Sequence, residues 1–505
     1  MPEGPTSSSS FSIRKKAESD FPLIIQGGMG AGVSAWPLAK AVSVCGHLGV
    51  VSGTALDVII ARRLQAGDPG GHIRRALSAF PFPEMSRRIV EKYFIEGGKK
   101  NDEPFRTVPM CTMNLSQAHL ELIVAANFVE VFLAKEGHNG AIGINYLEKI
   151  QVPQLASIYG AMLAGVDYVL VGAGIPREIP GVLDSFADGK EASMRLSVLG
   201  ADKDDDFRMT FDPATFSGGA HQLLRRPRFF AIIASVVLAQ TLVKKGSGKV
   251  DGLVIEGPSA GGHNAMPRGV LKLDASGEPV YGPKDVVDLD SIKALGAPFW
   301  LAGAYGTSQG LKEAFSLGAS GIQAGTPFAF CEESGLTKEI RESILKKVLE
   351  GTATVFTDPK ASPTGFPFKL LRLEGSNSDD DVFSARKRVC DLGYLRHLYR
   401  KAENEAGYRC PAEPIDEYVK KGGIAEETAG CKCLCNGLMA NIGLAQRRSE
   451  GFVELPLLTA GKELSIVRDI IGEKGGRISY SAKDVLGHIL KDSMAAAVNT
   501  IYRVK

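Results

Sequence analysis

Short apolar runs that end in glycine recur along this chain and alternate with segments of helical spacing. Runs of this length, bounded by turn residues, are typical of strands buried on both faces. They are predicted at residues 23–28, 48–53, 142–145, 168–174, 229–235, 253–256, 299–303 and 321–325. Helices are predicted between and after them at Ser34–Val44, Asp57–Gln65, Ile73–Ala79, Arg87–Phe94, Gln154–Ala164, Val237–Lys245, Asp290–Leu295, Ser308–Ser316 and Thr337–Leu349.

This alternation predicts an α/β fold with a parallel sheet covered by helices. Eight strand–helix units favour a closed TIM-type (β/α)8 barrel, which carries its site at the carboxyl ends of the strands. An open doubly wound sheet is the alternative, since periodicity does not separate the two. Residues 1–20 are predicted to be a disordered tail and 21–375 the barrel, followed by a mainly helical C-terminal extension, 376–505.

Two regions interrupt the pattern and are predicted as insertions, one near residues 80–140 and one at 180–222. In the first, Thr107–Asn114 and Phe128–Leu133 are each candidate strands. The second is charged and irregular, with an acidic cluster at Asp202–Asp206, and is expected to be an insertion or lid.

The composition of the chain argues against some classes of function, such as binding to nucleic acid or to a membrane. The chain has 505 residues and a net charge of +2, so no strong field favours nucleic acid or an acidic membrane. The longest apolar run, Phe229–Val243, is too short to span a bilayer. Without a recognisable signal sequence, the eight cysteines fit a reducing cytosol, so a cytoplasmic enzyme is expected. The oligomeric state stays open, a homo-oligomer included.

Two loose motif matches fail on their context. Gly30–Ala35 fits the dinucleotide pattern, but the second strand ends in Ser52-Gly53-Thr54 without the acid that would hold a ribose. Gly257–Gly261 fits the hydrolase elbow, but Gly262–Gly269 cannot begin the helix that this elbow requires.

The strand ends themselves are better candidates. Leu253–Glu256 leads into Gly257, Gly261 and Gly262, where the backbone lacks side chains and a ligand can approach closely, and then into His263. Gly303 ends the seventh predicted strand, and Gly325-Thr326 end the eighth. In a barrel these two neighbouring loops form the usual phosphate cradle.

Cys431, Cys433 and Cys435 have no common zinc spacing, although Cys410 is available as a fourth thiolate. Free thiols are the default interpretation, with a metal ion or cluster as the alternative. No metal ligand is therefore assigned.

As an ordered set, these motifs resemble the nitronate monooxygenase family, formerly the 2-nitropropane dioxygenases, which is related to flavin-dependent enoyl-acyl-carrier-protein reductases. The resemblance covers residues 21 to about 373. It is carried by 25–29 (IQGGM), 260–263 (AGGH), 301–303 (LAG), 321–328 (GIQAGTPF) and 364–367 (TGFP).

The resemblance implies an FMN-binding barrel with His263 as the catalytic base of nitronate oxidation. Cofactor-binding residues implied by the family motifs are Gln26, Gly27, Gly28, Met29, Asn145, Gly261, Gly262, Gly303, Tyr305, Gln323, Ala324, Gly325 and Thr326. Asn114 is a weaker competitor for the role of Asn145. A histidine suits proton exchange near neutrality, while the flavin carries the electrons.

The chain also departs from the family. Ser259 stands where an acid is frequent, and Ala304-Tyr305 replaces a glycine and an aliphatic residue. Because the insertions and the extension would reshape the pocket, three functions are open for a small-molecule substrate. The first is oxidation of alkyl nitronates with O2. The second is reduction of an enoyl thioester, with NAD(P)H as electron donor and an acyl-carrier protein as partner. The third is a flavin-binding scaffold without turnover.

Overall fold

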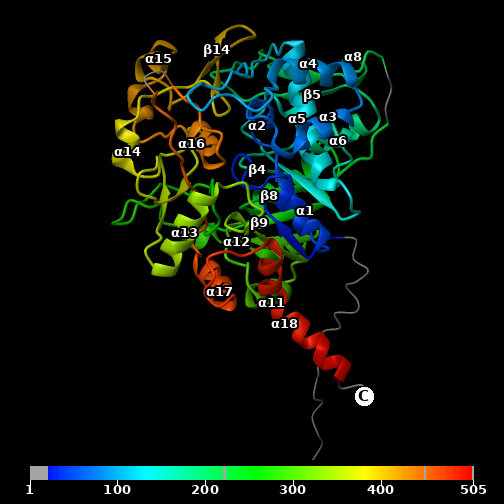
Figure 1. The fold of residues 1–505 in the computed structure, drawn as a ribbon, viewed down its shortest axis with the longest axis vertical. Helices are drawn as coiled ribbons and strands as arrows, with labels where there is room; N and C mark the ends of the chain where they lie inside the picture. Colours follow the sequence, from blue (N-terminus) through cyan, green and yellow to red (C-terminus); the bar gives the residue numbers. More distant parts are fainter. Residues whose placement is uncertain (1–20, 220–222, 449–450, 503–505) are drawn as a thin grey trace, which may run out of the picture.

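Eight parallel strands form a closed barrel in the computed structural model, which describes residues 21–219, 223–448 and 451–502 (Figure 1). The strands run in the order β1-β11-β10-β9-β8-β4-β3-β2. The first and last strands also meet, since the Gln26 amide donates to the Leu48 carbonyl at 2.9 Å and the Leu48 amide to the Ile24 carbonyl at 3.0 Å. The barrel prediction is confirmed. Its strands are β1 Ile24–Gln26, β2 Gly49–Ser52, β3 Ile142–Leu147, β4 Tyr168–Gly172, β8 Arg228–Ile233, β9 Gly252–Glu256, β10 Phe299–Ala302 and β11 Gly321–Ala324.

Side chains fill the barrel interior, as expected for a small barrel. Phe230 and Trp300 lie at its centre, with ring centroids 4.6 Å apart, and Tyr168 packs edge-on against Phe230. The Trp300 indole N–H donates to the Pro22 carbonyl at 2.7 Å. This packed plug forms the floor beneath the carboxyl ends of the strands.

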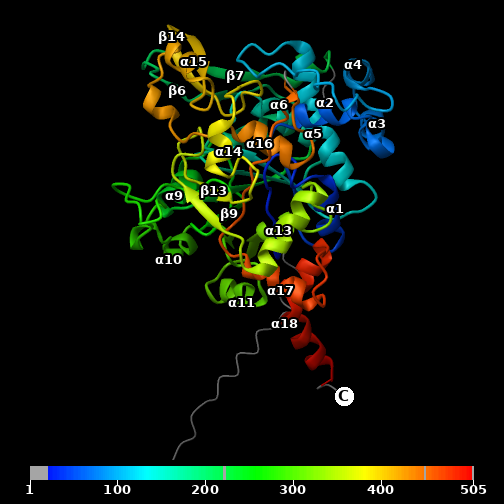
Figure 2. The ribbon, with the colours of Figure 1, turned by 60° about the vertical axis from the view of Figure 1, so that its left-hand side comes forward.

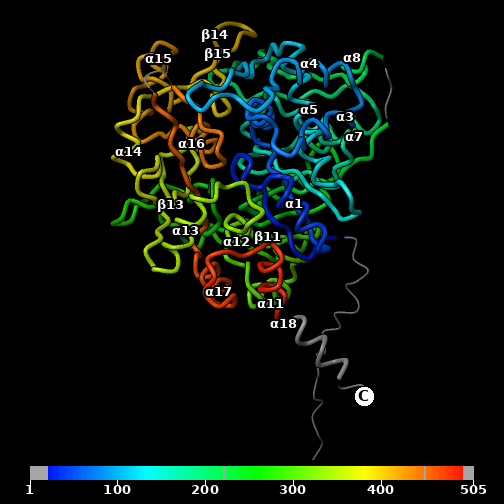
Figure 3. The backbone as a smooth tube through the Cα atoms, in the orientation of Figure 1, coloured from blue at the N-terminus to red at the C-terminus, as the bar shows by residue number. Residues whose placement is uncertain are grey.

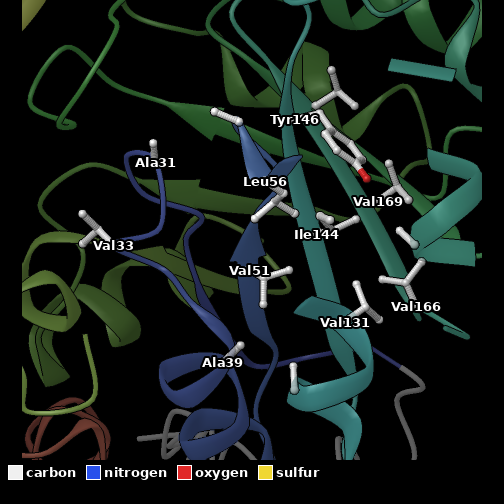
Figure 4. Packing of buried hydrophobic residues seen from close by; sticks show 14 of the residues in the cluster. Ala31, Val33, Ala39, Val51, Leu56, Val131, Ile144, Tyr146, Val166 and Val169 are labelled. Atoms are coloured by element: carbon white, nitrogen blue, oxygen red, sulfur yellow. The ribbon is translucent and has the colours of Figure 1, made fainter. Parts of the chain in front are cut away.

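Helices surround the barrel and bury the outer faces of its strands. Figure 4 shows this layer, in which Ala39, Val51, Ile144 and Val131 meet between strands and helices. The helices that follow the barrel strands are α1 Trp36–Val44, α2 Leu56–Gln65, α6 Gln154–Leu163, α7 Ile179–Ala187, α9 Val236–Lys245, α10 Leu289–Lys293, α11 Ser308–Ser316, α12 Thr326–Ala329 and α13 Lys338–Glu350.

The strand predictions in the first insertion are wrong. Phe128–Leu133 lies inside helix α5 (Gln117–Lys135), which is capped at its start by the Ser116 side chain. This helix contacts α1, α2 and α6, so it is apolar on most sides and shows no helical periodicity. Thr107–Asn114 is a loop. Three further short helices precede it: η2 Pro69–Gly71, α3 His72–Ser78 and α4 Pro83–Tyr93.

By length and composition α5 also resembles a membrane span, and 78% of its most apolar window is buried inside the protein. Core helices of soluble proteins have the same composition, so this helix is weak support for a membrane location.

The second insertion is more regular than predicted, since its beginning is the barrel helix α7. Beyond α7, an antiparallel pair is formed by β5 (Ala192–Arg195) and β7 (Arg208–Phe211), followed by α8 (Pro213–Phe216). Between them, β6 (Val198–Leu199) pairs with a strand of the C-terminal extension. Residues 220–222 of this segment lie outside the described residues, as does the predicted tail at 1–20.

The extension is mainly helical, as predicted, and it wraps around the barrel (Figures 1 and 2). In the tube view, α14 and α16 lie beside one flank, whereas α17 lies at the opposite end from β14 (Figure 3). The Tyr394 hydroxyl of the extension donates to Asp57 at the start of α2. Elements after α13 are β12 Val355–Asp358, β13 Phe368–Leu371, α14 Asp380–Ala385, β14 His397–Ala402, β15 Glu405–Arg409, α15 Ile415–Lys420, η4 Ala425–Thr428, α16 Leu434–Asn441, α17 Ser465–Glu473 and α18 Ala482–Tyr502.

Candidate active site

One cavity of about 260 Å³ lies at the carboxyl ends of the barrel strands, and all eight strands contribute to it. The strand-end residues that line it include Gly28, Ser52, Asn145, Gly172, Ile232, Glu256, Ala302 and Gln323. Parallel strands in a barrel present all their carboxyl ends on one face, so residues far apart in sequence converge there. A single shared cavity at this face is the expected position of an active site.

Two amide side chains at the cavity have unused hydrogen-bonding capacity. Asn145 ends up beside Gly28, where an added Cβ would lie 2.3 Å from the Asn145 Cβ. Gln323 lies against Gly27 in the same way, at 3.3 Å. The side-chain oxygens of both amides are buried without a hydrogen-bond partner among the described residues. Buried acceptors of this kind call for a donor from a ligand or water, and the N–H edge of a flavin ring fits them.

The loops after β10 and β11 form the opposite part of the cavity. Gly303 has φ +90° and Ala304 φ +66°, so the backbone turns sharply where the strand ends. An added Cβ at Gly303 would lie 2.8 Å from the Ser259 Oγ, so only glycine fits this turn without displacement. Tyr305 and Thr326 also line the cavity. The glycine-bounded loops leave room for a ligand to approach the backbone closely at this end of the cavity.

His263 is fixed by pairing between its loop and β13. The Lys369 amide donates to the Gly262 carbonyl at 3.0 Å, and the Asn264 amide donates to the Pro367 carbonyl at 2.9 Å. The imidazole packs edge-on against Phe368, with centroids 4.9 Å apart. These contacts hold the ring at the cavity wall, so the position of the histidine is set before any ligand binds.

The electrostatics of His263 make it a neutral proton acceptor. Burial lowers the pKa of His263 from 6.5 to about 4, so the imidazole is uncharged at neutral pH. Its Nε2 lies 2.6 Å from the Ser362 Oγ, which in turn lies 2.8 Å from the Thr364 Oγ1. The other ring nitrogen, Nδ1, has no hydrogen-bond partner within the described part of the chain.

Sequence reasoning missed two titratable groups beside His263. Glu256, the last residue of β9, lines the cavity, and burial raises the pKa of its carboxyl from 4.5 to about 7. Lys369 lies fully buried behind the loop, donating to Asn264 Oδ1 at 2.6 Å and Thr357 Oγ1 at 3.0 Å. Burial lowers the pKa of Lys369 to about 8. The sequence did carry a signal for Glu256, because its carboxyl group stands at the end of a buried barrel strand.

The extension completes the cavity, as the sequence allowed, through residues that the sequence did not indicate. The Gly262 amide donates to the Thr459 hydroxyl at 2.9 Å, and the Gly461 amide donates to the Thr326 hydroxyl at 2.9 Å. These bonds place segment 458–461 over both the histidine loop and the β11 loop. Tyr394, Leu434 and Met439 close another side.

Most predicted site residues meet at this cavity, and two do not. Gln26 is fully buried beneath it, where its amide accepts from the Val50 N–H at 3.0 Å and donates to Ser34 Oγ at 2.9 Å. Asn114 is exposed on the loop before α5. The predicted residues that line the cavity are Gly27, Gly28, Met29, Asn145, Gly261, Gly262, His263, Gly303, Tyr305, Gln323, Ala324, Gly325 and Thr326.

The fold and this cavity define a (β/α)8-barrel protein with an enzyme-like site, and comparisons with known proteins show what part of it resembles. Residues 228–363, which include His263, match the family model of nitronate monooxygenase. The rest of the chain lies outside this match, so the similarity to the nitronate monooxygenase family holds for residues 228–363.

Individual relatives match parts of the chain. The nitronate monooxygenase of Pseudomonas aeruginosa is 32% identical over 125 residues, covering 24% of this chain and 33% of that protein. The (3aS,4S,5R,7aS)-5-hydroxy-7a-methyl-1-oxo-octahydro-1H-indene-4-carboxyl-CoA dehydrogenase of Rhodococcus jostii is 21% identical over 314 residues, covering 61% of this chain and 76% of that protein. The first three curated relatives are matched over only 26–36% of their length. Among solved structures, FabK from Thermotoga maritima is 16% identical with a TM-score of 0.47, covering 98% of both chains.

Proposed function

We propose that this protein is an FMN-dependent nitronate monooxygenase, which oxidises alkyl nitronates with O2 and uses His263 as its base. The observation that carries this proposal is a neutral imidazole fixed at the wall of the shared cavity. The match of residues 228–363 to the family model of nitronate monooxygenase supports it, because this segment contains His263.

The residues around the cavity suit FMN. The unpartnered amide oxygens of Asn145 and Gln323 would accept from N–H groups at the ring edge. Gly27, Gly28 and Met29 would line the ring, while Gly303, Tyr305 and the 323–326 segment would hold the phosphate. Bound FMN would supply two-electron oxidation of the substrate and transfer of those electrons to O2.

His263 is positioned to act as a base. With a pKa of about 4, the imidazole is unprotonated at neutral pH, so it can accept a proton but carries none to give as an acid. In the tautomer whose Nε2–H donates to Ser362, Nδ1 is the atom that would take the proton from the α-carbon of a nitroalkane, giving the nitronate that is then oxidised. The resulting imidazolium would then face the anionic nitro group.

A second candidate is an NAD(P)H-dependent enoyl-thioester reductase, which would act on substrates carried by coenzyme A or an acyl-carrier protein. It is supported by the Rhodococcus jostii relative, whose name describes a carboxyl-CoA substrate and whose match extends over 61% of this chain. Thioester carriers are long, so a cavity assembled from both barrel and extension would suit them.

One pair of assays on the purified protein separates these candidates. Oxygen consumption with an alkyl nitronate is the expected result, and His263→Ala should lose the activity with the parent nitroalkane, whose α-proton the base removes. Oxidation of NAD(P)H that depends on an enoyl thioester, without turnover of the nitronate, would overturn the proposal in favour of the reductase. Flavin bound to both wild type and His263→Ala, with neither activity, would indicate a scaffold.

The cofactor is tested separately by the absorption spectrum and by chromatography of the released flavin. Flavin bands, and FMN rather than FAD in the released material, are expected at about one per chain. A colourless protein that does not take up added FMN would refute the cofactor assignment.

A further inference from the structure

Four cysteine side chains line a small second cavity in the extension. Cys390, Cys410, Cys433 and Cys435 come from three separate segments and meet there. In the structure all four are free thiols. We propose that these four cysteines bind an iron–sulfur cluster.

The cysteines lie too close together, and too far from solvent, to be independent surface thiols. Cys410 and Cys433 are 6% and 7% exposed and belong to one cluster of buried residues, against which Cys390 packs. Cys390 lies at the centre of the four cysteines. It shares a hydrogen bond with Cys410 and lies close enough to Cys433 and Cys435 to interact with both electrostatically. Four thiols around one point supply the complete ligand set of a [2Fe–2S] or [4Fe–4S] cluster.

Two arginines, Arg386 and Arg396, lie near this group of thiols. The Nη1 of Arg386 is buried and has no hydrogen-bond partner among the described residues. An unused cationic donor beside a cysteine suits a cluster, because N–H groups directed at the cluster sulfurs tune the reduction potential of the cluster.

The proposed site adjoins the candidate active site. Leu395, Leu434 and Cys435 line both cavities, so they form a shared wall. The Cys390 and Cys410 segments have no regular structure at the cysteines themselves, and Cys433 is the residue that precedes α16. Bonds to one cluster would therefore join three otherwise separate loops and fix this wall of the active-site cavity.

The test is the iron and acid-labile sulfide content of the full-length protein, purified without oxygen and reconstituted with ferrous iron and sulfide. Equal amounts of iron and sulfide, at about two or four of each per chain, are expected. Broad visible absorbance that bleaches on reduction with dithionite, and an electron paramagnetic resonance signal in the reduced protein, should accompany them.

Variants identify the ligands. Cys390→Ser and Cys435→Ser should lose the iron and the bleachable absorbance. Cys45→Ser, at an exposed position, and Cys431→Ser, adjacent to the site but outside the cavity lining, should keep both. Reconstituted wild-type protein without iron, zinc in place of iron, or a cluster that survives in Cys390→Ser and Cys435→Ser would each overturn the proposal. Because metal content is measured on wild-type protein first, a variant that fails to fold does not decide the outcome.

Discussion

Nε2 of His263 lies 2.6 Å from the hydroxyl oxygen of Ser362, a residue 99 positions further along the chain. Ser362 is 4% exposed and is held in turn by Thr364, whose amide donates to the Ser362 Oγ at 3.2 Å. The hydroxyl therefore fixes both the orientation of the imidazole and the nitrogen that remains free. In this arrangement Ser362 is a positioning residue for the base.

Ser362→Ala should lower kcat by about 10- to 100-fold, because a free imidazole loses the orientation needed for proton transfer. The flavin content should stay unchanged, since Ser362 does not line the cavity. The measurement is steady-state turnover with the parent nitroalkane together with the pH profile of kcat/KM. Ser316→Ala, at an exposed position at the end of α11, is the control. Unchanged kcat and an unchanged pH profile in Ser362→Ala would contradict the positioning role.

The two titratable groups at the end of β9 should give opposite dependences of stability on pH. The folded protein binds the His263 proton less tightly than the unfolded chain, so its contribution to the free energy of unfolding falls as pH falls from 6.5 toward 4. The folded protein binds the Glu256 proton more tightly than the unfolded chain, so the contribution of Glu256 to the free energy of unfolding falls as pH rises from 4.5 toward 7. Each effect is expected to be on the order of 2 kcal/mol, since both groups line a cavity that solvent enters.

Thermal unfolding at several pH values measures these contributions. Glu256→Gln should raise Tm relative to wild type at pH 8 more than at pH 5, because the amide removes a carboxylate that burial disfavours. His263→Gln should raise Tm relative to wild type more at low pH than at pH 8. A constant difference in Tm across the whole range, for either variant, would mean that the group is solvated in the folded protein.

Gly303→Ala should reduce flavin retention. Gly303 has φ +90°, which other residues rarely adopt, and an added Cβ would lie 2.8 Å from the Ser259 Oγ and 3.2 Å from the Ala260 amide nitrogen, so Ser259 or the loop after β10 must shift. The strained backbone costs about 1–3 kcal/mol, and the displaced loop is the one expected to hold the flavin phosphate. The flavin-to-protein absorbance ratio after gel filtration is the measurement. Gly472→Ala, where an added Cβ meets nothing within 4 Å, should retain flavin as wild type does. Equal retention in Gly303→Ala would place the phosphate elsewhere.

The barrel was predictable because each of its strands is a short buried run with its own turn residues. The same reasoning failed at Phe128–Leu133, where a helix buried on most sides presents as many apolar residues in a row as a buried strand does. Apolar runs identify burial, and only periodicity or length separates helix from strand.

The lining of the cavity was predictable where its residues lie in a strand or in the loop that follows it, as with Asn145, Gln323 and His263. It was unpredictable where contacts join distant segments. Thr459 reaches the Gly262 amide across 197 positions, and no local pattern marks a threonine for that contact. The part of the cavity formed by the extension therefore emerged only from the folded chain.

Glu454 should be among the most sensitive positions for stability in the extension. Its carboxylate accepts from Arg386 Nε at 2.8 Å and Arg386 Nη2 at 2.7 Å, and the two side chains are 0% and 2% exposed. Arg448 donates to the same carboxylate at 2.7 Å. Glu454→Ala would leave two arginines without their shared partner in a buried site, at a cost of about 3–5 kcal/mol. Chemical denaturation measures it.

An exposed ion pair in the same extension provides the control for Glu454→Ala. Lys401 and Glu405 lie 3.4 Å apart, with side chains 50% and 60% exposed, and water screens such pairs so that they contribute about 0–1 kcal/mol. Glu405→Ala should therefore leave the denaturation midpoint nearly unchanged. If Glu454→Ala destabilises the protein no more than Glu405→Ala does, the buried ion pair does not stabilise the extension. A large loss of stability that is confined to Glu454→Ala and is accompanied by release of flavin would mean that the extension and the cofactor cavity unfold as one unit.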